Sequence, residues 1–182
     1  MKYIIVDLEA TCWATKDKNN TNEIIEIGAI CINSDKETES EFSEFIKPTL
    51  YPVLSDFCTK LTSITQKDIE TADTFEKVIE RFKAWIPVSE DYLLCSWGFY
   101  DKSQFISDCN LHHTDATWVS KHISLKHQHT DIKKLNRPVG MSGALKMDGI
   151  ALQGIHHRGI DDARNISKLF LKYFDHWKFK TT

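Results

Sequence analysis

The order of the apolar segments constrains the fold of this chain more than any other feature of its sequence. Short apolar runs typical of buried strands lie at residues 3–8, 23–33, 41–46 and 92–97. Segments predicted as helices lie at residues 55–61, 75–86, 101–111, 142–149 and 160–177. Strands that come first and helices that come later, with one helix between two strands, favour an α/β fold over an all-β barrel. We therefore predict a mixed central β-sheet flanked by helices.

Local signals mark the ends of several of these segments. Ser55 and Thr74 are candidate helix N-caps, since their hydroxyls can accept a hydrogen bond from a free backbone N–H. Pro87 is predicted to end the helix that precedes it, and the polar residues 16–22 are predicted to form a loop. Residues 112–140 show no regular pattern, so no element is predicted there.

Length and composition are those of an ordinary globular protein. With 182 residues, of which 41% are hydrophobic and 27% charged, the chain is expected to form a single domain over residues 1–182. No apolar run approaches the roughly 20 residues needed to cross a bilayer, and Asp7 interrupts the first run too early for a signal peptide. We therefore expect a cytoplasmic protein without a membrane partner.

The five cysteines include no CxxC pair, which indicates neither a disulfide framework nor a zinc knuckle.

The charge balance argues against a protein that simply coats nucleic acid. Lys and Arg number 23 and Asp and Glu number 26, which gives a net charge of −3. Residues 121–137 nevertheless gather five basic residues and three histidines against one acid, although a solvated surface is the better explanation for such a segment taken alone. The chain has no GxxxxGK[ST] loop, so a kinase or a helicase is disfavoured.

Two carboxylates stand at the end of the first predicted strand. Asp7 and Glu9 are separated by one residue, so strand alternation places both side chains on one face and Leu8 on the other. Neighbouring carboxylates repel each other, and a divalent cation would neutralise them; oxygen ligands favour Mg²⁺ or Mn²⁺ over zinc. A lone Asp-x-Glu is also common in solvated turns, so the interpretation depends on partners elsewhere in the chain.

Three further residues are candidates for the same site. Asp101 lies where a predicted strand leads into a helix, a position where an ordinary N-cap is the alternative. His157 and Asp162 lie at the start of the last predicted helix, where an acid also suits the helix dipole and a histidine can be a packed polar residue. Each residue has a structural explanation when it is taken alone, so the interpretation depends on the pattern that the five residues form together.

This joint order resembles a known family. An N-terminal Asp-x-Glu, a mid-chain Asp and a C-terminal His-x-x-x-x-Asp are similar to the DEDDh (DnaQ-like) exonucleases. Within them the chain looks like the Eri-type branch, which includes the histone-mRNA 3'-exonuclease and bacterial relatives called sporulation-kinase-pathway inhibitors. The resemblance is carried by residues 4–13, 22–30, 45–69, 96–105 and 156–166. It implies a ribonuclease H-like three-layer fold.

The resemblance also implies a role for each candidate residue. Asp7, Glu9, Asp101 and Asp162 would bind two Mg²⁺ ions, for which Mn²⁺ could substitute, and His157 would be the general base.

The histidine and the aspartate are both doubled, so the family spacing leaves a choice. His156 with Asp161 fits as well as His157 with Asp162, and the context of Gly159 and Asn165 favours the second pair.

Substrate contacts are predicted from the same segments. Phe57 resembles the position that stacks on the terminal base, with a helix core residue as the alternative. Ala10, Thr11 and Tyr100 are further candidates for contacts with the substrate.

The function expected from this resemblance is that of a metal-dependent 3'-to-5' exonuclease. It would act on single-stranded nucleic acid or 3' overhangs, with RNA favoured, and release nucleoside 5'-monophosphates. Two alternatives remain open: an exonuclease that prefers DNA, and a regulatory module that keeps the fold but acts through protein contacts. The presence of all five catalytic positions speaks against the second alternative.

Overall fold

The computed structural model describes residues 1–15, 20–86 and 91–180. Part of the predicted loop at residues 16–22 lies outside the described residues. The predicted helix end at Pro87 also lies outside them. No helix in the described part of the chain is long and apolar enough to cross a membrane.

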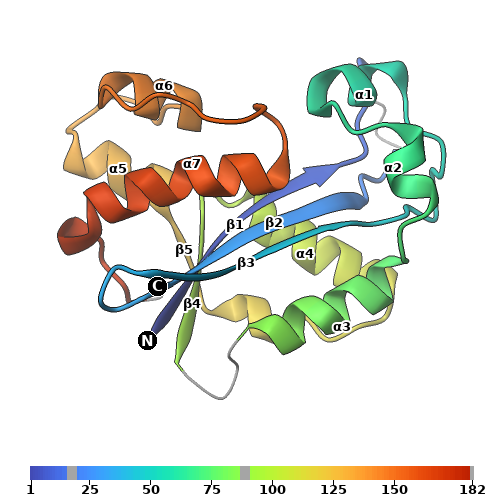
Figure 1. Cartoon of the computed structure of the whole chain (residues 1–182), viewed down its shortest axis with the longest axis horizontal. Helices are drawn as coiled ribbons and strands as arrows, with labels where there is room; N and C mark the ends of the chain where they lie inside the picture. Colours follow the sequence, from blue (N-terminus) through green and yellow to red (C-terminus); the bar gives the residue numbers. More distant parts are fainter. Residues whose placement is uncertain (16–19, 87–90, 181–182) are drawn as a thin grey trace.

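A mixed sheet forms the centre of the fold (Figure 1). The described residues place five strands in the order β3-β2-β1-β4-β5. Their bounds are β1 Lys2–Ala10, β2 Ile24–Asn33, β3 Thr38–Phe45, β4 Tyr92–Ser96 and β5 His122–Ser124. The first three strands form an antiparallel meander, while β4 and β5 run parallel to β1. The carboxyl ends of β1 and β4 therefore meet at one edge of the sheet, where parallel strands commonly carry a site.

Helices cover both faces of the sheet (Figure 1). Their bounds are α1 Asp56–Thr62, α2 Gln66–Glu70, α3 Phe75–Trp85, α4 Tyr100–Leu111, α5 Leu125–Ile132, α6 Met141–Met147 and α7 Gly159–Lys172. One core joins α3 and α4 to the even-numbered residues of β1, and a second joins α6 and α7 to the odd-numbered residues. The predicted arrangement of a mixed sheet between helical layers is thus confirmed.

Helix α7 begins in close contact with β2. A Cβ atom on Gly28 would lie 2.0 Å from the carbonyl carbon of Gly159, so only a residue without a side chain lets the helix start at this place. The first turn of α7 is thereby held directly against the sheet.

The prediction was wrong for part of residues 112–140. This segment contains a short 3₁₀ helix at Thr117–Ser120, the edge strand β5 and helix α5. The strand has only three residues, and two of them are a buried histidine and a buried serine, so it lacks the apolar run by which strands are predicted.

The last predicted helix is also shorter than expected. Helix α7 ends at Lys172, and a 3₁₀ turn follows at Phe174–His176. The apolar spacing continues to Trp177 because this turn still packs on the same core, where the Trp177 Nε1–H donates a hydrogen bond of 2.8 Å to the Phe170 carbonyl.

Candidate active site

Four carboxylates converge at the carboxyl end of β1. The strand continues to Ala10, so Asp7 and Glu9 lie within it and point to the face that α7 covers. Asp162 reaches them from the first turn of α7, and one carboxylate oxygen from each of these three residues lies within 4.8 Å of the others. Asp101, in the first turn of α4, accepts a hydrogen bond of 3.1 Å from the backbone N–H of Leu8. It is therefore not the N-cap of its helix.

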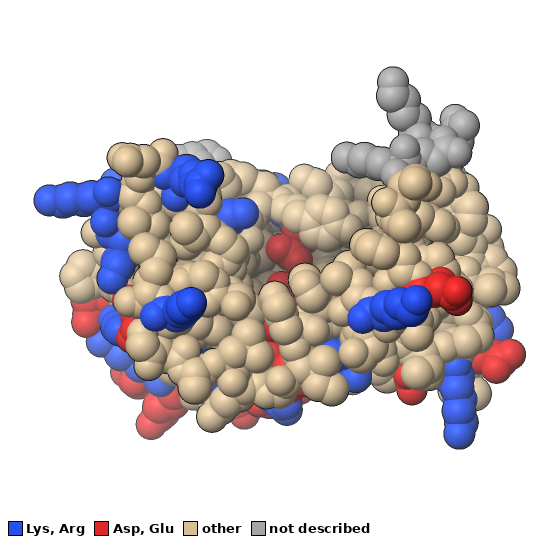
Figure 2. Space-filling view, turned by 90° about the horizontal axis from the view of Figure 1, so that it is seen from above, with Lys and Arg blue, Asp and Glu red and all other residues tan. Residues whose placement is uncertain are grey.

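These acids line one cavity of about 370 Å³. Seen from above, the molecule is hollowed near its centre, and acidic side chains form the floor of the hollow (Figure 2). The remaining lining residues of the cavity are Leu8, Trp97, Tyr100, Gly140, Met141, Ser142, His156 and His157. No Lys or Arg is among the described residues that line it. The cluster of acids thus has no cationic side chain to balance it.

The environment of the carboxyl groups disfavours their charged form. Burial raises the pKa of Asp7 well above its usual range, and the charges of Asp101, Glu9 and Asp162 add to the effect. Burial and the charge of Asp162 raise the pKa of Glu9 to about 8. Burial raises the pKa of Asp101 to about 6, opposed by hydrogen bonds from Ser96 and from the backbone. A divalent cation bound by these oxygen atoms would relieve the repulsion, so the donor set fits Mg²⁺ or Mn²⁺.

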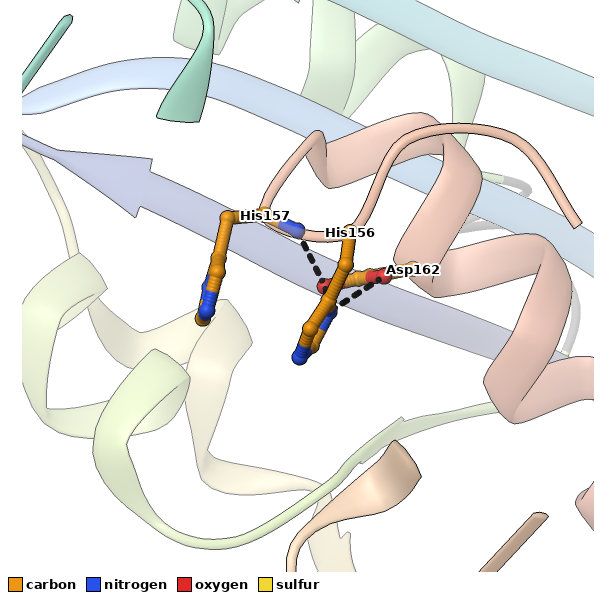
Figure 3. A group of neighbouring side chains, drawn as sticks. All are labelled: His156, His157 and Asp162. Atoms are coloured by element: carbon orange, nitrogen blue, oxygen red, sulfur yellow. Dashed lines mark hydrogen bonds and ion pairs between the residues drawn. The ribbon is translucent and has the colours of Figure 1, made fainter. Parts of the chain in front are cut away.

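Both histidines of the doubled pair lie beside Asp162 (Figure 3). The Nδ1 atom of His156 is 3.1 and 2.9 Å from the two carboxylate oxygens of Asp162. The backbone N–H of His157 donates a hydrogen bond of 3.0 Å to the same carboxylate. The His157 ring stacks on the His156 ring, with centroids 4.0 Å apart, and burial lowers the pKa of His157. At neutral pH, His157 is therefore an uncharged imidazole at the cavity wall.

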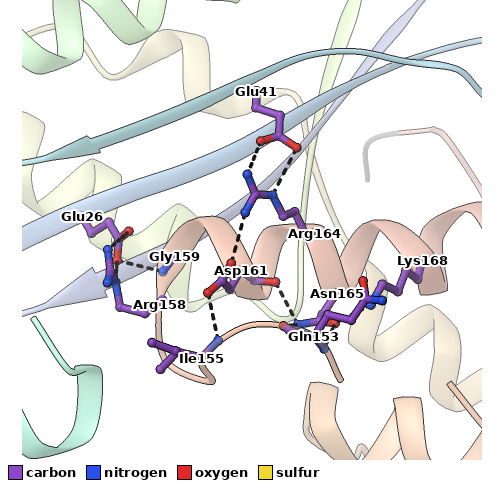
Figure 4. A network of polar contacts seen from close by, with 10 residues as sticks. All are labelled: Glu26, Glu41, Gln153, Ile155, Arg158, Gly159, Asp161, Arg164, Asn165 and Lys168. Atoms are coloured by element: carbon purple, nitrogen blue, oxygen red, sulfur yellow. Dashed lines mark hydrogen bonds and ion pairs between the residues drawn. The ribbon is translucent and has the colours of Figure 1, made fainter. Parts of the chain in front are cut away.

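Asp161 takes no part in this cluster (Figure 4). Its carboxylate accepts hydrogen bonds from the backbone N–H of Ile155, at 2.9 Å, and from Arg164 Nη1, at 3.2 Å. The alternative pair of His156 with Asp161 is not brought together, because the His156 ring contacts Asp162 instead.

A partly buried ion pair holds the turn that carries both histidines (Figure 4). Arg158 donates to Glu26 from Nε at 3.1 Å and from Nη2 at 3.2 Å, and the Gly159 N–H donates to the same carboxylate at 2.9 Å. Glu26 lies on β2 and is fully buried. The turn before α7 is thereby fixed to the sheet.

The predicted substrate contacts divide into two groups. Tyr100 lines the cavity, and Phe57 is 41% exposed on α1, so the alternative that Phe57 is a helix core residue is wrong. Ala10 and Thr11 are buried and do not line the cavity, and the Thr11 hydroxyl accepts a hydrogen bond of 2.9 Å from the Glu23 N–H. Ala10 and Thr11 therefore lie next to cavity residues in the sequence but do not face the cavity, and the Thr11 side chain forms a hydrogen bond within the protein.

Some cavity residues carried no signal in the sequence. Trp97 lies between a strand and a glycine, and Gly140, Met141 and Ser142 lie at or next to the start of α6, 20 or more residues from the acids of the cavity in the sequence. Only the folded arrangement reveals them.

The basic segment at residues 121–137 is partly neutralised. Lys121 pairs with Asp91 at 3.0 Å, and Lys133 pairs with Asp148 at 2.9 Å. These two lysines serve contacts within the protein.

The sequence of this chain matches a known protein family and several known proteins. A family model described as "Exonuclease" (RNase_T) matches residues 4–170. The chain is 31% identical to ERI1 exoribonuclease 2 of Xenopus laevis, over 91% of this chain and 27% of that protein. It spans between 27% and 51% of the length of the Xenopus, mouse and human relatives.

Solved structures show the same fold. A structure described as 3'-end specific recognition of histone mRNA stem-loop by 3'-exonuclease aligns with a TM-score of 0.89 and 28% identity, over 94% of this chain and 63% of that chain. The nuclease domain of 3'hExo, described as a DEDDh family member bound to rAMP, aligns with a TM-score of 0.86 and 28% identity, over 96% of this chain and 92% of that chain. These matches confirm the predicted resemblance and the predicted ribonuclease H-like fold.

Proposed function

Since this chain belongs to the exonuclease family whose model matches residues 4–170, we propose that it is a metal-dependent 3'-to-5' exonuclease. Its substrates are single-stranded nucleic acid or 3' overhangs, and its products are nucleoside 5'-monophosphates. The observation that carries the proposal is the convergence of Asp7, Glu9, Asp101 and Asp162 in one cavity whose described lining includes no Lys or Arg.

The four acids are the proposed ligands of two Mg²⁺ ions, with Mn²⁺ able to substitute. The charges of Asp101, Glu9 and Asp162 all act on Asp7, so Asp7 would hold cations together with these three residues. When bound, such a pair of cations lowers the pKa of a water molecule and stabilises charge on a phosphate and on its leaving oxygen. The raised pKa values of Asp7, Glu9 and Asp101 support this assignment, because they show that buried, crowded carboxylates are costly to ionise here and a bound cation would offset that cost.

His157 is the proposed general base. Its lowered pKa keeps the imidazole uncharged, so it can take a proton from the attacking water. The water oxygen forms a bond to the phosphorus, and the bond from phosphorus to the 3'-oxygen of the preceding nucleotide breaks. The terminal nucleotide then leaves with a 5'-phosphate. His156 contacts the carboxylate of Asp162 and steadies the ring of His157 through stacking.

RNA is the favoured substrate. The Xenopus relative is named an exoribonuclease, and one aligned structure describes recognition of a histone mRNA stem-loop. The exposed Tyr100 and Phe57 offer aromatic surfaces on which a terminal base can stack. Discrimination against DNA would require contacts with the 2'-hydroxyl.

The test uses end-labelled single-stranded RNA and DNA of matched sequence. Each is incubated with the protein in the presence of Mg²⁺, Mn²⁺ or EDTA, and the products are separated by length. We expect stepwise shortening from the 3' end that EDTA abolishes, with RNA shortened faster than DNA. Cleavage that persists in EDTA, or internal cuts, would contradict the proposed class. A faster reaction on DNA would contradict only the preference for RNA.

A further inference from the structure

A second and larger cavity lies beside the candidate active site. It has a volume of about 540 Å³ and is formed by the start of α4, by β5 with the start of α5, and by the C-terminal residues 178–180. We call it the β5 groove. The turn between β4 and α4 separates the two cavities, since Trp97 and Tyr100 line the acidic one and Phe99 lines the groove. A ligand that leaves the acidic cavity past this turn therefore meets the groove directly.

The groove begins with an aromatic platform. Phe99 is 53% exposed although it is a large apolar side chain, and its ring stacks on the ring of His127 with centroids 4.9 Å apart. The ring of His122 lies 5.8 Å from that of Phe99. Exposed stacked rings of this kind bind nucleic-acid bases without regard to sequence, because every base has a flat π-face.

Positive charge continues along the groove. Lys178 and Lys180 line it, and no acidic residue is among its described lining residues. Neither lysine forms an ion pair within the described part of the chain. Lys126 lies close to the shared turn, since a Cβ atom on Gly98 would be 3.9 Å from its Cδ. These charges suit a phosphate backbone.

The C-terminal segment is fastened in place. The Lys178 N–H donates a hydrogen bond of 2.7 Å to the Gln128 side chain, and the Gln128 amide donates one of 3.0 Å to the Lys178 carbonyl. Both lysine side chains therefore extend from a segment that is fixed to α5.

His122 forms a buried part of the groove wall. Its Nε2 atom lies 2.8 Å from the Ser96 hydroxyl, and its Nδ1 atom has no hydrogen-bond partner among the described residues. Burial lowers the pKa of His122 to about 4, so the ring beside Phe99 is uncharged at neutral pH.

We propose that the β5 groove binds the nucleic-acid strand on the 5' side of the bond that is cut, with a base on Phe99 and His127 and phosphates on Lys126, Lys178 and Lys180. This inference rests on the proposed function, because the terminal nucleotide at the acids must be joined to a strand that leaves the cavity. The groove starts at the rim of that cavity and has the aromatic and cationic surface such a strand requires.

The test compares a dinucleotide with an oligonucleotide of about twelve nucleotides, since only the longer one can reach the groove. Two variants weaken the groove at separate places: Phe99→Ala and the double variant Lys178→Gln/Lys180→Gln. The matched control is Lys67→Gln/Lys83→Gln, which removes two positive charges from α2 and α3. For each protein, kcat/KM is measured on both substrates with Mg²⁺.

We expect the ratio of kcat/KM for the long substrate to that for the dinucleotide to fall about tenfold in each groove variant, the size typical of one lost base stack or phosphate contact. The control should keep the ratio of the parent protein. An unchanged ratio in both groove variants would overturn the inference and leave the proposed function standing. Circular dichroism reports whether Phe99→Ala folds. If this variant does not fold, the inference is tested with Lys178→Gln/Lys180→Gln alone.

A separate measurement distinguishes the two proposals. If the parent protein cleaves neither substrate, the proposed function fails, and the groove is then tested by fluorescence anisotropy of a labelled oligonucleotide in EDTA. Weaker binding to both groove variants than to the control would still support the groove as a nucleic-acid site. Equal binding to all of the proteins would overturn it.

Discussion

Two neighbouring aspartates of α7 have opposite surroundings. Asp162 is buried against the other acids, whereas Asp161 faces Arg164 and the backbone of Ile155. We predict that Asp162→Asn lowers kcat for the labelled oligonucleotide at least about 100-fold, because it removes one charge from the proposed cation site. Asp161→Asn, the matched control on the same helical turn, should stay within about threefold of the parent protein. A large loss in the control with normal cleavage by Asp162→Asn would reverse the assignment.

The adjacent histidines offer a second matched pair. We predict that His157→Ala lowers kcat about 100-fold or more, the usual size for loss of a general base. His156→Ala should cost much less, since it removes a contact with Asp162 but leaves the proposed base in place. Steady-state rates of both variants at saturating Mg²⁺ provide the comparison. If His156→Ala is the inactive protein and His157→Ala is not, the base is His156.

The sequence predicted which acids form the candidate site, but not the contacts that their side chains make. Strand alternation determines that Asp7 and Glu9 share a face, so their convergence could be predicted. The contact between His156 and Asp162 depends on the backbone of His157, which has a φ of 64°, in the left-handed region. Nothing in the residue spacing predicts that a non-glycine residue adopts this conformation, so the geometry of the doubled pair required the fold.

Among the elements, the turn before α7 depends on one buried carboxylate. Glu26 is fully buried, and Arg158 is the side chain that neutralises it. We predict that Arg158→Met destabilises the protein by about 3–5 kcal/mol, because it leaves an unpaired charge in the interior. Urea unfolding followed by circular dichroism measures the loss.

The double variant Arg158→Met/Glu26→Gln serves as the control for that loss. Removing both charges should recover part of the stability, since an uncharged amide costs less to bury than an unpaired carboxylate. A double variant that is less stable than Arg158→Met would show that the guanidinium contributes mainly through packing, as its contact with the Phe45 ring at 5.0 Å also allows.

The elements that the sequence failed to predict are those without an apolar pattern. Strand β5 and helix α5 bury polar residues such as His122, Ser124 and His129, and contacts with other parts of the chain determine their conformation. Helix α3, by contrast, was predicted with nearly correct ends because its buried residues recur at helical spacing. The proposed groove lies on β5 and α5, so its location could not be predicted from periodicity.

For the whole molecule, the acid cluster makes stability depend on pH and on cations together. In the protein without cations, the carboxyl of Glu9 has a pKa of about 8, well above its ordinary value of 4.5. A raised pKa in the folded state means that folding favours the protonated form. This contribution is complete below about pH 4 and is lost as the pH rises towards 8. Asp7 and Asp101 act in the same direction.

Other titrating groups do not obscure this dependence. Burial of Asp148 is outweighed by hydrogen bonds from Tyr173 and Lys133, which lower its pKa to about 2, so it is fully ionised in the range from pH 6 to pH 8. Burial raises the pKa of Asp108 to about 6, and a hydrogen bond with Cys12 lowers the pKa of Cys58 to about 7. These two groups and His122 do not line the acidic cavity, so they contribute nearly equally with and without cations. A difference in Tm between samples with Mg²⁺ and with EDTA therefore isolates the acid cluster.

We predict that saturating Mg²⁺ raises Tm more at pH 8 than at pH 6. At the lower pH the cations must displace protons from Glu9 and its neighbours, which weakens their net binding, whereas at the higher pH they neutralise carboxylates that repel each other. The Asp162→Asn variant should show a smaller rise at both pH values, and Asp161→Asn should behave as the parent protein does. A rise in Tm that is equal at the two pH values, or larger at pH 6, would mean that the cations bind elsewhere than at these carboxylates.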